Sequence, residues 1–301
     1  MGYGQKEDAA RARATVKQLT LHHGGHGGHG GQAVQDLSSV SSVSSVVESL
    51  KLLDWPAIES SLDAQGFAKL PPILTPGECG TLAGFYRDDA LFRSRIDMAR
   101  FRFGVGEYKY FAAPLPAIVQ TLREHLYARL APIANRWVAR LQPALSKTLT
   151  LRQAQRERRV EGPSRDTPQY ADTLDGFLRT CHAAGQTRPT PLLLSYVAGG
   201  YNCLHQDIYG DLAFPLQVVF VLSRPGVDYT GGELLLVEQR PRAQSRGHAI
   251  AVEQGGAVIF ATRERPVAGA RGSYRVVMRH GVSTLTSGAR MSLGIIFHDA
   301  T

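Results

Sequence analysis

The sequence of 301 residues is poor in cysteine, tryptophan and methionine, and it has no long apolar run. Its cysteines, Cys79, Cys181 and Cys203, are odd in number and widely spaced, which argues against a disulfide framework and favours a reducing compartment. The longest apolar stretches, 216–222 and 291–297, are far shorter than the ~18 residues that a membrane span needs. We therefore expect a cytoplasmic protein that does not cross a membrane.

Several common site signatures are also missing. There is no Gly-Lys-Ser/Thr phosphate loop, no strand-borne GxGxxG and no CxxC pair, so phosphate-loop, dinucleotide and zinc-ribbon interpretations have no support. Hydrophobic residues make up 43% and charged residues 20%, which is ordinary for a globular chain and excludes a wholly disordered or fibrous one. Acidic residues are in the minority, 26 against 34 lysines and arginines, and the net charge of +8 favours polyanionic partners without specifying one.

The first fifty residues differ in composition from the rest. Residues 22–31 read HHGGHGGHGG and residues 38–49 are largely a Ser/Val repeat, with too little apolar mass to offset the entropy of ordering. We expect residues 1–50 to be a disordered His/Gly/Ser-rich tail. Its four histidines could bind a divalent metal loosely, although a flexible linker is the simpler interpretation.

Residues 51–190 are predicted to form an α-rich support region. A short strand is expected at 67–70, and the segment Thr75-Pro76-Gly77-Glu78 has the pattern of a capping box that starts a helix running to about residue 86. Apolar residues at helical spacing predict one or two helices over 117–141. The polar stretch 151–188 is interpreted as a helix followed by a long connection.

From residue 191 onward, short β-prone runs alternate with glycine-containing turns. The expected strands are 192–197, 216–223, 233–238, 249–253, 257–262, 274–280 and 291–298. Short strands at nearly regular spacing predict an antiparallel sandwich or barrel. The predicted fold is therefore mainly β with a supporting α layer, a double-stranded β-helix (jelly roll) in which residues 191–301 form the chemical core.

One local pattern carries candidate chemistry. His205-Gln206-Asp207 follows a predicted strand and a glycine turn, and His280 ends a later β-prone run. Two imidazoles and one carboxylate form the facial triad that holds Fe(II) and leaves coordination positions open. On an extended segment residues i and i+2 project to the same side, so His205 and Asp207 can reach one ion while Gln206 points away. His280, from another strand, is the candidate third ligand.

A candidate anchor for a second molecule follows the triad. Arg290 lies ten residues beyond His280, at the entry to the next predicted strand. A guanidinium there could hold the far carboxylate of a dicarboxylate in a bidentate pair inside the barrel. A surface arginine at the turn formed by Ser287 and Gly288 is the alternative for this residue taken alone.

These residues resemble the Fe(II)/2-oxoglutarate-dependent oxygenases. The stretch LLLSYVAGGYNCLHQD is similar to the strand, glycine turn and HxD entry of prolyl-4-hydroxylase-like members, and RHGVSTLTSGARMSLGIIF to their histidine-to-arginine segment. LHQD also resembles the corresponding tetrapeptide of AlkB-type nucleic-acid demethylases. More closely still, TPLLLSYVAGGYNCLHQDIYGDLAFPLQ and EQRPRAQSR resemble a bacterial oxygenase group that is predicted to repair alkylated DNA oxidatively.

The resemblance implies roles for particular residues. His205, Asp207 and His280 would be the catalytic iron ligands, Arg290 would hold 2-oxoglutarate, and Tyr196 would donate a hydrogen bond to that cosubstrate or else be a core tyrosine. Fe(II), 2-oxoglutarate and O2 are the implied cofactors, with ascorbate as a candidate reductant. The second strand-end arginine of AlkB-type enzymes is missing, because residues 295–297 are apolar, so cosubstrate binding looks hydroxylase-like.

The sequence leaves the prime substrate open. Arg102, Tyr108, Tyr110 and Arg275 are candidate contacts to DNA or RNA, because basic and aromatic residues interleave around them. A half-buried strand, with phenylalanine inward and arginine in water, explains the same alternation around residues 101–103. From residue 191 on, ten arginines face eight acidic residues, so most of the basic excess lies upstream of the predicted core.

Three functional alternatives follow from this uncertainty. The first is oxidative demethylation of alkylated DNA, which the resemblance favours. The second is hydroxylation of a peptidyl proline or a small molecule. The third is a non-catalytic, cupin-like metal-binding module in which the HxD pattern is incidental.

Overall fold

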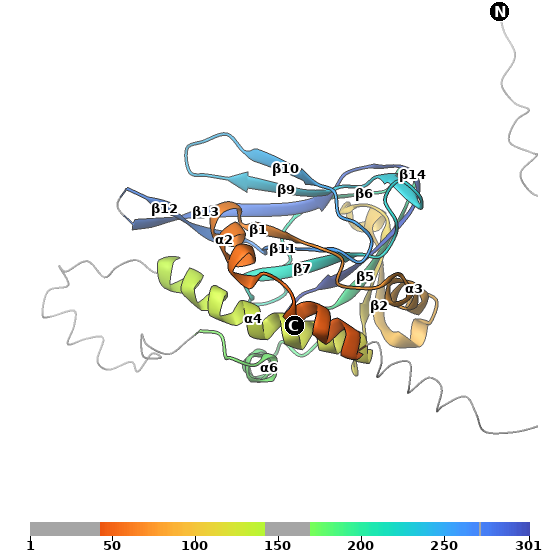
Figure 1. The fold of residues 1–301 in the computed structure, drawn as a ribbon, viewed down its shortest axis with the longest axis horizontal. Coiled ribbons are helices and arrows are strands. Elements are labelled where there is room, and N and C mark those ends of the chain that lie inside the picture. Colours follow the sequence, from red (N-terminus) through yellow and green to blue (C-terminus); the bar gives the residue numbers. More distant parts are fainter. Residues whose placement is uncertain (1–42, 142–168, 271) are drawn as a thin grey trace, which may run out of the picture. The chain divides into compact units, whose positions relative to one another are not determined.

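Two antiparallel sheets face each other in the computed structural model, which describes residues 43–141, 169–270 and 272–301 (Figure 1). All described residues belong to one compact unit. None of the helices within these ranges is long and apolar enough to cross a membrane.

Eight strands form the centres of the two sheets. They are β5 (Leu192–Val197), β6 (Tyr201–His205), β7 (Leu216–Val221), β9 (Leu234–Gln239), β10 (Arg246–Ile250), β11 (Ala257–Ala261), β13 (Gly272–Val282) and β14 (Leu285–Ile295). One sheet contains the order β11-β7-β14-β5 and the other contains β10-β9-β13-β6. Successive strands of this set switch sheets, except that β9 and β10 are neighbours in one sheet. This is the topology of a double-stranded β-helix, so the predicted fold class is confirmed.

Shorter strands extend both sheets. They are β1 (Phe67–Leu70) beside β11, β4 (Glu107–Phe111) beside β5, β2 (Phe92–Asp97) beside β4, β3 (Gly104–Val105) beside β6, β8 (Tyr229–Gly231) beside β14 and β12 (Glu264–Gly269) beside β13. The region before residue 191 therefore contributes strands as well as helices. The predicted division at that residue does not separate two packing units.

Burial along the strands reflects what covers each sheet. In β11 all of Ala257–Ala261 is buried, because helices cover the outer face of the larger sheet and the smaller sheet covers its inner face. In β9 the inward-facing Leu234, Leu236 and Glu238 are buried, whereas Leu235 and Val237 are partly exposed on the solvent side. A continuous apolar run and an alternating run thus identify a doubly covered and a singly covered strand, as expected.

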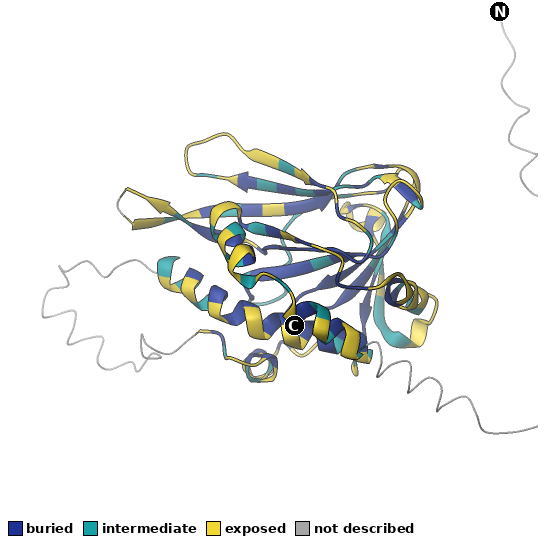
Figure 2. Cartoon of the chain, viewed as in Figure 1, coloured by how far each residue is buried: buried dark blue, intermediate teal, exposed yellow. Residues whose placement is uncertain are grey.

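The helices pack beneath the larger sheet. They are α2 (Trp55–Gln65), α3 (Pro76–Phe85), α4 (Ala117–Leu141) and α6 (Leu174–Ala183), with short 3-10 turns η1 (Asp89–Leu91) and η2 (Met98–Phe101). The predicted capping box is present, since Thr75 Oγ1 accepts from Glu78 N while the Glu78 carboxylate accepts from Thr75 N. Of the one or two helices predicted over 117–141, the structure shows the single helix α4, whose sheet-facing side is buried and whose other side is exposed (Figure 2).

Two expectations about the helical region need correction. Residues 43–51 are helical, and Val46 and Leu50 are buried in the core, so the disorder predicted for residues 1–50 is wrong for residues 43–50. The rest of that predicted tail lies outside the described residues. The stretch expected to be a connection before residue 188 contains α6, which Thr173 caps and which buries Leu174, Phe177 and Cys181 against the core. The helix predicted from residue 151 lies mostly outside the described residues.

A buried ion pair joins the helical layer to the sheet. Arg123 of α4 donates from Nη2 to Asp299 Oδ1 at 2.7 Å and to the carbonyl of Phe297 at 2.9 Å, and from Nε to the carbonyl of Ile296 at 3.0 Å. The side chains of Arg123 and Asp299 are 2% and 4% exposed. The cation therefore satisfies carbonyl groups just beyond the end of β14 and fixes the helix against that strand.

Candidate metal centre and its pocket

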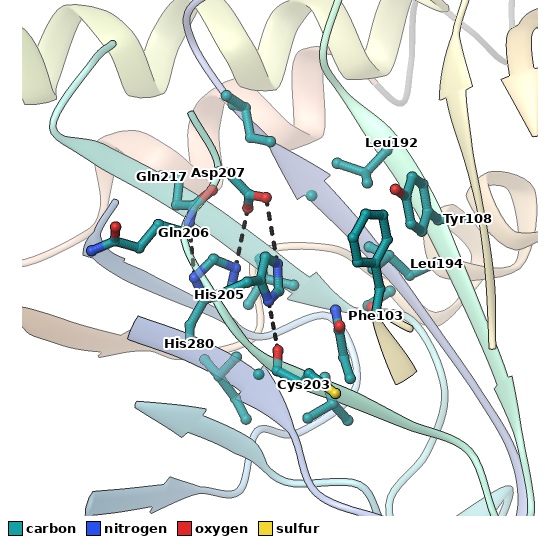
Figure 3. A pocket seen from close by; sticks show the side chains of 18 of the residues that line it. Phe103, Tyr108, Leu192, Leu194, Cys203, His205, Gln206, Asp207, Gln217 and His280 are labelled. Atoms are coloured by element: carbon teal, nitrogen blue, oxygen red, sulfur yellow. Dashed lines mark hydrogen bonds and ion pairs between the residues drawn. The ribbon is translucent and has the colours of Figure 1, made fainter. Parts of the chain in front are cut away.

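Three side chains that could ligate a metal converge between the sheets. His205 ends β6, and His280 lies directly opposite it on β13, where the two are paired in register. Asp207 follows two residues after His205; its Oδ1 lies 3.4 Å from His205 Nε2 and its Oδ2 lies 3.1 Å from His280 Nε2. All three ligand atoms lie within 4.8 Å of one another. The structure thus brings together the three residues that the sequence singles out (Figure 3).

Backbone contacts explain why these three side chains face one another. His205 Nδ1 lies 2.7 Å from the carbonyl of Cys203, which leaves Nε2 directed at Asp207. Gln206 points away, as the i, i+2 argument predicts, and its amide donates to the carbonyl of Met278 on β13 at 2.8 Å (Figure 3). This bond ties the HxD segment to the strand that carries His280. Directly after His280 the pairing of β13 with β6 shifts register, before Val282 pairs with Asn202.

Two tyrosine hydroxyls form a hydrogen-bonded chain that ends on the Asp207 carboxylate. Tyr209 donates its hydroxyl to Asp207 Oδ1 at 2.7 Å, and Tyr110 donates to the Tyr209 hydroxyl at 2.9 Å. Partners of this kind fix the orientation of a ligating carboxylate. The sequence interpretation does not identify this partner. The available signal is that Tyr209 stands two residues after Asp207, so that its side chain leaves the chain on the same side.

The electrostatics of the three groups suit a divalent cation. Burial would raise the pKa of Asp207, but the rings of His280 and His205 outweigh it and hold that pKa well below its ordinary value. Burial lowers the pKa of His280. For His205, burial acts in the same direction, but the adjacent carboxylate outweighs it and raises the pKa. An ionised carboxylate beside a buried neutral imidazole presents the lone pairs that a metal ion needs.

The triad opens into a cavity of about 370 Å³ between the two sheets. Its walls come from β4, β5, β6, β7, β13 and β14 and include Tyr108, Tyr110, Leu192, Leu194, Tyr196, Gln217, Val219, Arg290 and Ser292. Such a volume lies at the lower end of the range for small-molecule sites. It suits a small cosubstrate together with a group of similar size.

Arg290 and Tyr196 occupy this cavity with unsatisfied polar atoms. Arg290 is 1% exposed; its Nη1 donates to Ser292 Oγ at 3.2 Å, whereas its Nε has no partner among the described residues. The Tyr196 hydroxyl is also buried without a hydrogen bond there, and the two residues are paired across β14 and β5. Burial raises the pKa of Tyr196, which keeps its hydroxyl a donor.

The donor set fits the cofactors that the sequence implies. Two histidines and one carboxylate with open positions are the ligands of non-haem Fe(II) oxygenases. Burying a charged arginine with an N–H group that has no hydrogen-bond partner costs free energy, and a bound anion would offset this cost. The cavity is therefore suited to a carboxylate ligand such as 2-oxoglutarate. The assignment of Arg290 and Tyr196 to that ligand stays a prediction.

Three of the four candidate substrate contacts lie at the cavity, and the fourth does not. Arg102, Tyr108 and Tyr110 line the cavity. Arg275 does not: it lies on the outer part of β13, where its side chain is 57% exposed and its Nε is 3.2 Å from Glu264 Oε2. Arg275 therefore has no contact with the pocket that contains the triad.

Comparisons with known proteins agree with this site. A family model described as "Oxygenase, catalysing oxidative methylation of damaged DNA" matches residues 106–169 and 144–300. Two uncharacterized proteins of Mycobacterium tuberculosis, from strains CDC 1551 and H37Rv, are each 48% identical over 190 residues, which is 63% of this chain and 72% of each relative.

The solved structures that match this chain are more distant in sequence. A prolyl-4-hydroxylase from Pseudomonas putida is 15% identical, with a TM-score of 0.44 over 82% of this chain and 100% of that one. An oxidoreductase of the 2OG-Fe(II) oxygenase family from Burkholderia pseudomallei is 13% identical, with a TM-score of 0.46 over 83% of this chain and 94% of that one. These values are too low to assign a substrate.

Proposed function

This chain belongs to the oxygenase family described as acting on damaged DNA, within the Fe(II)/2-oxoglutarate-dependent oxygenases, and we propose that it removes alkyl groups from nucleic-acid bases by oxidation. The family's description supports the nucleic-acid substrate, and one structural observation supports the oxidative chemistry. The His205, Asp207 and His280 triad shares a single cavity with the buried, incompletely paired Arg290, so a metal and a dicarboxylate can be held side by side.

The overall reaction balances with the groups that this cavity fits. With iron and 2-oxoglutarate bound, the site would supply the oxidising power to insert one atom of O2 into a C–H bond, while the other atom enters succinate and carbon dioxide leaves. On an N-methylated base, the methyl group becomes N–CH2OH. The C–N bond then breaks with transfer of the hydroxyl proton to nitrogen, giving formaldehyde and the unmodified base. Oxidation of the methyl group therefore amounts to demethylation.

The protein's own residues hold and shield the reactants. Asp207 is kept ionised and is oriented by the hydroxyl of Tyr209. Arg290 and Tyr196 offer unsatisfied donors to the cosubstrate at the buried side of the cavity. Part of the cavity wall is apolar and keeps water away from the reacting centre; it includes Leu192, Leu194 and Val219.

Substrate-stimulated turnover tests the proposal. The full-length chain, supplied with Fe(II), 2-oxoglutarate and O2, should release succinate faster when an N-methylated single-stranded oligonucleotide is added, with formaldehyde produced in equal amount. His205→Ala should lose both products. The matched control is His125→Ala, which removes an exposed histidine of α4 outside the cavity.

Three results would contradict the proposal. If methylated oligonucleotides did not stimulate turnover but a proline-containing peptide did, the enzyme would be a peptidyl hydroxylase. If a small molecule alone stimulated it, the nucleic-acid substrate would be wrong while the oxygenase remained. If His205→Ala kept full affinity for Fe(II) with 2-oxoglutarate, the metal centre itself would be misassigned.

A further inference from the structure

Two phenylalanine rings are exposed beside the cavity. Phe101 and Phe103 are 52% and 47% exposed, and their rings stack with centroids 5.6 Å apart and planes 20° from parallel. The half-buried strand considered from the sequence, with phenylalanine inward, is therefore wrong for this segment. Adjacent exposed aromatic rings are unfavourable in water and typically mark a binding surface.

The local backbone holds these rings in place. Phe101 ends η2, which is anchored by the fully buried Met98. Arg102 then adopts a left-handed conformation with φ of 59°, which is rare for a residue other than glycine. Conformations of this kind persist where the surrounding structure enforces them and are common at functional sites. Here the left-handed residue reverses the chain between the two stacked rings.

Strand pairing fixes this segment relative to the metal centre. The carbonyl of Phe103 accepts from Cys203 N at 2.8 Å, and Gly104 pairs with Asn202 of β6, the strand that ends at His205. At Gly104 a Cβ atom would lie 2.2 Å from the carbonyl oxygen of Tyr201, so only glycine allows this approach. Phe103 also lines the cavity, where Figure 3 shows it near Leu194 and Tyr108.

The chemistry around the rings is complementary to a polyanion. Arg100 and Arg102 are exposed on either side of Phe101, and no carboxylate among the described residues forms an ion pair with either guanidinium. Tyr201 and Leu204 of β6, which are 38% and 42% exposed, extend the apolar surface toward the cavity. Stacked aromatic rings flanked by unpaired arginines suit planar bases joined by phosphates.

Resting on the proposed function, we propose that Phe101, Phe103, Arg100 and Arg102 form a platform for a nucleic-acid single strand. The phenylalanines stack on bases, and the arginines contact the phosphates on either side. A cavity of about 370 Å³ admits one base but no duplex, so the target base must leave any stack before it reacts. The platform holds the neighbouring nucleotides while the target base enters.

Binding without turnover tests the platform. The affinity of the full-length chain for a fluorescent oligothymidylate is measured by anisotropy with EDTA present, so that neither iron nor cosubstrate contributes. Phe101→Ala and Phe103→Ala should each weaken binding by roughly 5- to 150-fold, the range found for loss of a stacked base. Val227→Ala, which trims a 69% exposed apolar residue outside the cavity, should leave binding unchanged.

Three further variants separate the contribution of stacking from those of general apolarity and charge. Phe101→Trp should retain wild-type affinity, whereas Phe101→Leu should bind as weakly as Phe101→Ala because it keeps apolar surface without a π face. Arg102→Gln should reduce the slope of log affinity against log salt by ~0.7, the value for one phosphate contact to a single strand.

Specific outcomes would overturn the platform. One is that Phe101→Leu binds the oligonucleotide as tightly as the wild type, and another is that the wild type binds duplex and single strand equally well. A third is that Phe101→Ala and Phe103→Ala lose binding to a proline-containing peptide but still bind the oligonucleotide. Because the assay contains no iron, its failure would leave oxidative dealkylation standing. Normal platform binding without stimulated succinate release would instead count against dealkylation alone.

Discussion

Replacing Tyr209 by phenylalanine removes the hydroxyl that donates to Asp207 Oδ1 at 2.7 Å and leaves the ring in place. A hydrogen bond to a charged acceptor contributes ~1.5–3 kcal/mol, and ~1.4 kcal/mol corresponds to a factor of ten in affinity. We therefore expect Tyr209→Phe to bind a divalent metal roughly 10- to 100-fold more weakly, in keeping with other losses of ligand-orienting groups. The ring should stay ordered, because it still packs beside Tyr110 and His298.

Calorimetric titration of the full-length chain with Mn(II), a redox-stable substitute for Fe(II), measures this effect. His205→Ala provides the background from histidines elsewhere in the chain, including those near the N-terminus. Tyr110→Phe should have a smaller effect than Tyr209→Phe, because it acts on Asp207 only through Tyr209. Tyr274→Phe, which removes a phenol outside the cavity, is the matched control. Unchanged Mn(II) affinity in Tyr209→Phe would refute the argument that this hydroxyl orients the carboxylate.

Three other perturbations have defined outcomes. Arg290→Gln keeps a polar side chain but loses the cation, so the KM for 2-oxoglutarate should rise at least ~10-fold with little change in Mn(II) affinity. Arg123→Met removes the guanidinium from the buried Asp299 carboxylate, whose other oxygen keeps His182 Nε2 at 2.9 Å, and it leaves the carbonyls of Ile296 and Phe297 without this donor. Urea denaturation should therefore show a loss of ~3–5 kcal/mol, part of which is recovered by adding Asp299→Asn. Burial alone would raise the pKa of Glu238, but the hydrogen bond and ion pair with Arg265 outweigh burial and lower this pKa below the ordinary 4.5. The Glu238 carboxylate therefore stabilises the fold above about pH 4.5, and its stabilisation is lost as the pH falls further. In Glu238→Gln, the free energy of unfolding should therefore fall less steeply as the pH is lowered. An unchanged dependence on pH would exclude the pair of Glu238 and Arg265 as a cause of the acid instability.

The strands that the sequence predicts are those whose side chains enter the apolar core. The run at β5 is predicted with the observed bounds, and those at β7 and β11 are too long by only one or two residues. The strand β6 is missed, because none of its residues Tyr201–His205 is buried and 202–205 line the cavity instead of entering the core. The strand β12 is missed because it begins with Glu264, Arg265 and Pro266 and pairs only with β13. Arg265 is buried in β12, where it forms an ion pair with the buried Glu238 of β9. This partner is distant in the sequence, so the local pattern of apolar residues does not predict the burial.

The site shows the same division between local and distant information. His205 and Asp207 are related by strand geometry over two residues, so their convergence could be predicted. The support from Tyr110 depends on β4 lying beside β5, a pairing between segments far apart in the chain. The position of Arg275 outside the cavity could also have been predicted from strand geometry. Arg275 lies five residues from His280 on the same strand, an odd separation that puts the two side chains on opposite faces, ~17 Å apart along the strand.

The strands β1 and β4 have a consequence for dissecting this enzyme. They occupy the outer edges of β11 and β5, and β3 occupies that of β6. A fragment containing only residues 191–301 would keep every metal-ligating side chain yet expose three open strand edges, which readily pair with other chains and aggregate. For domain transfer or directed evolution, the portable module should therefore include β1, β3 and β4 together with residues 191–301.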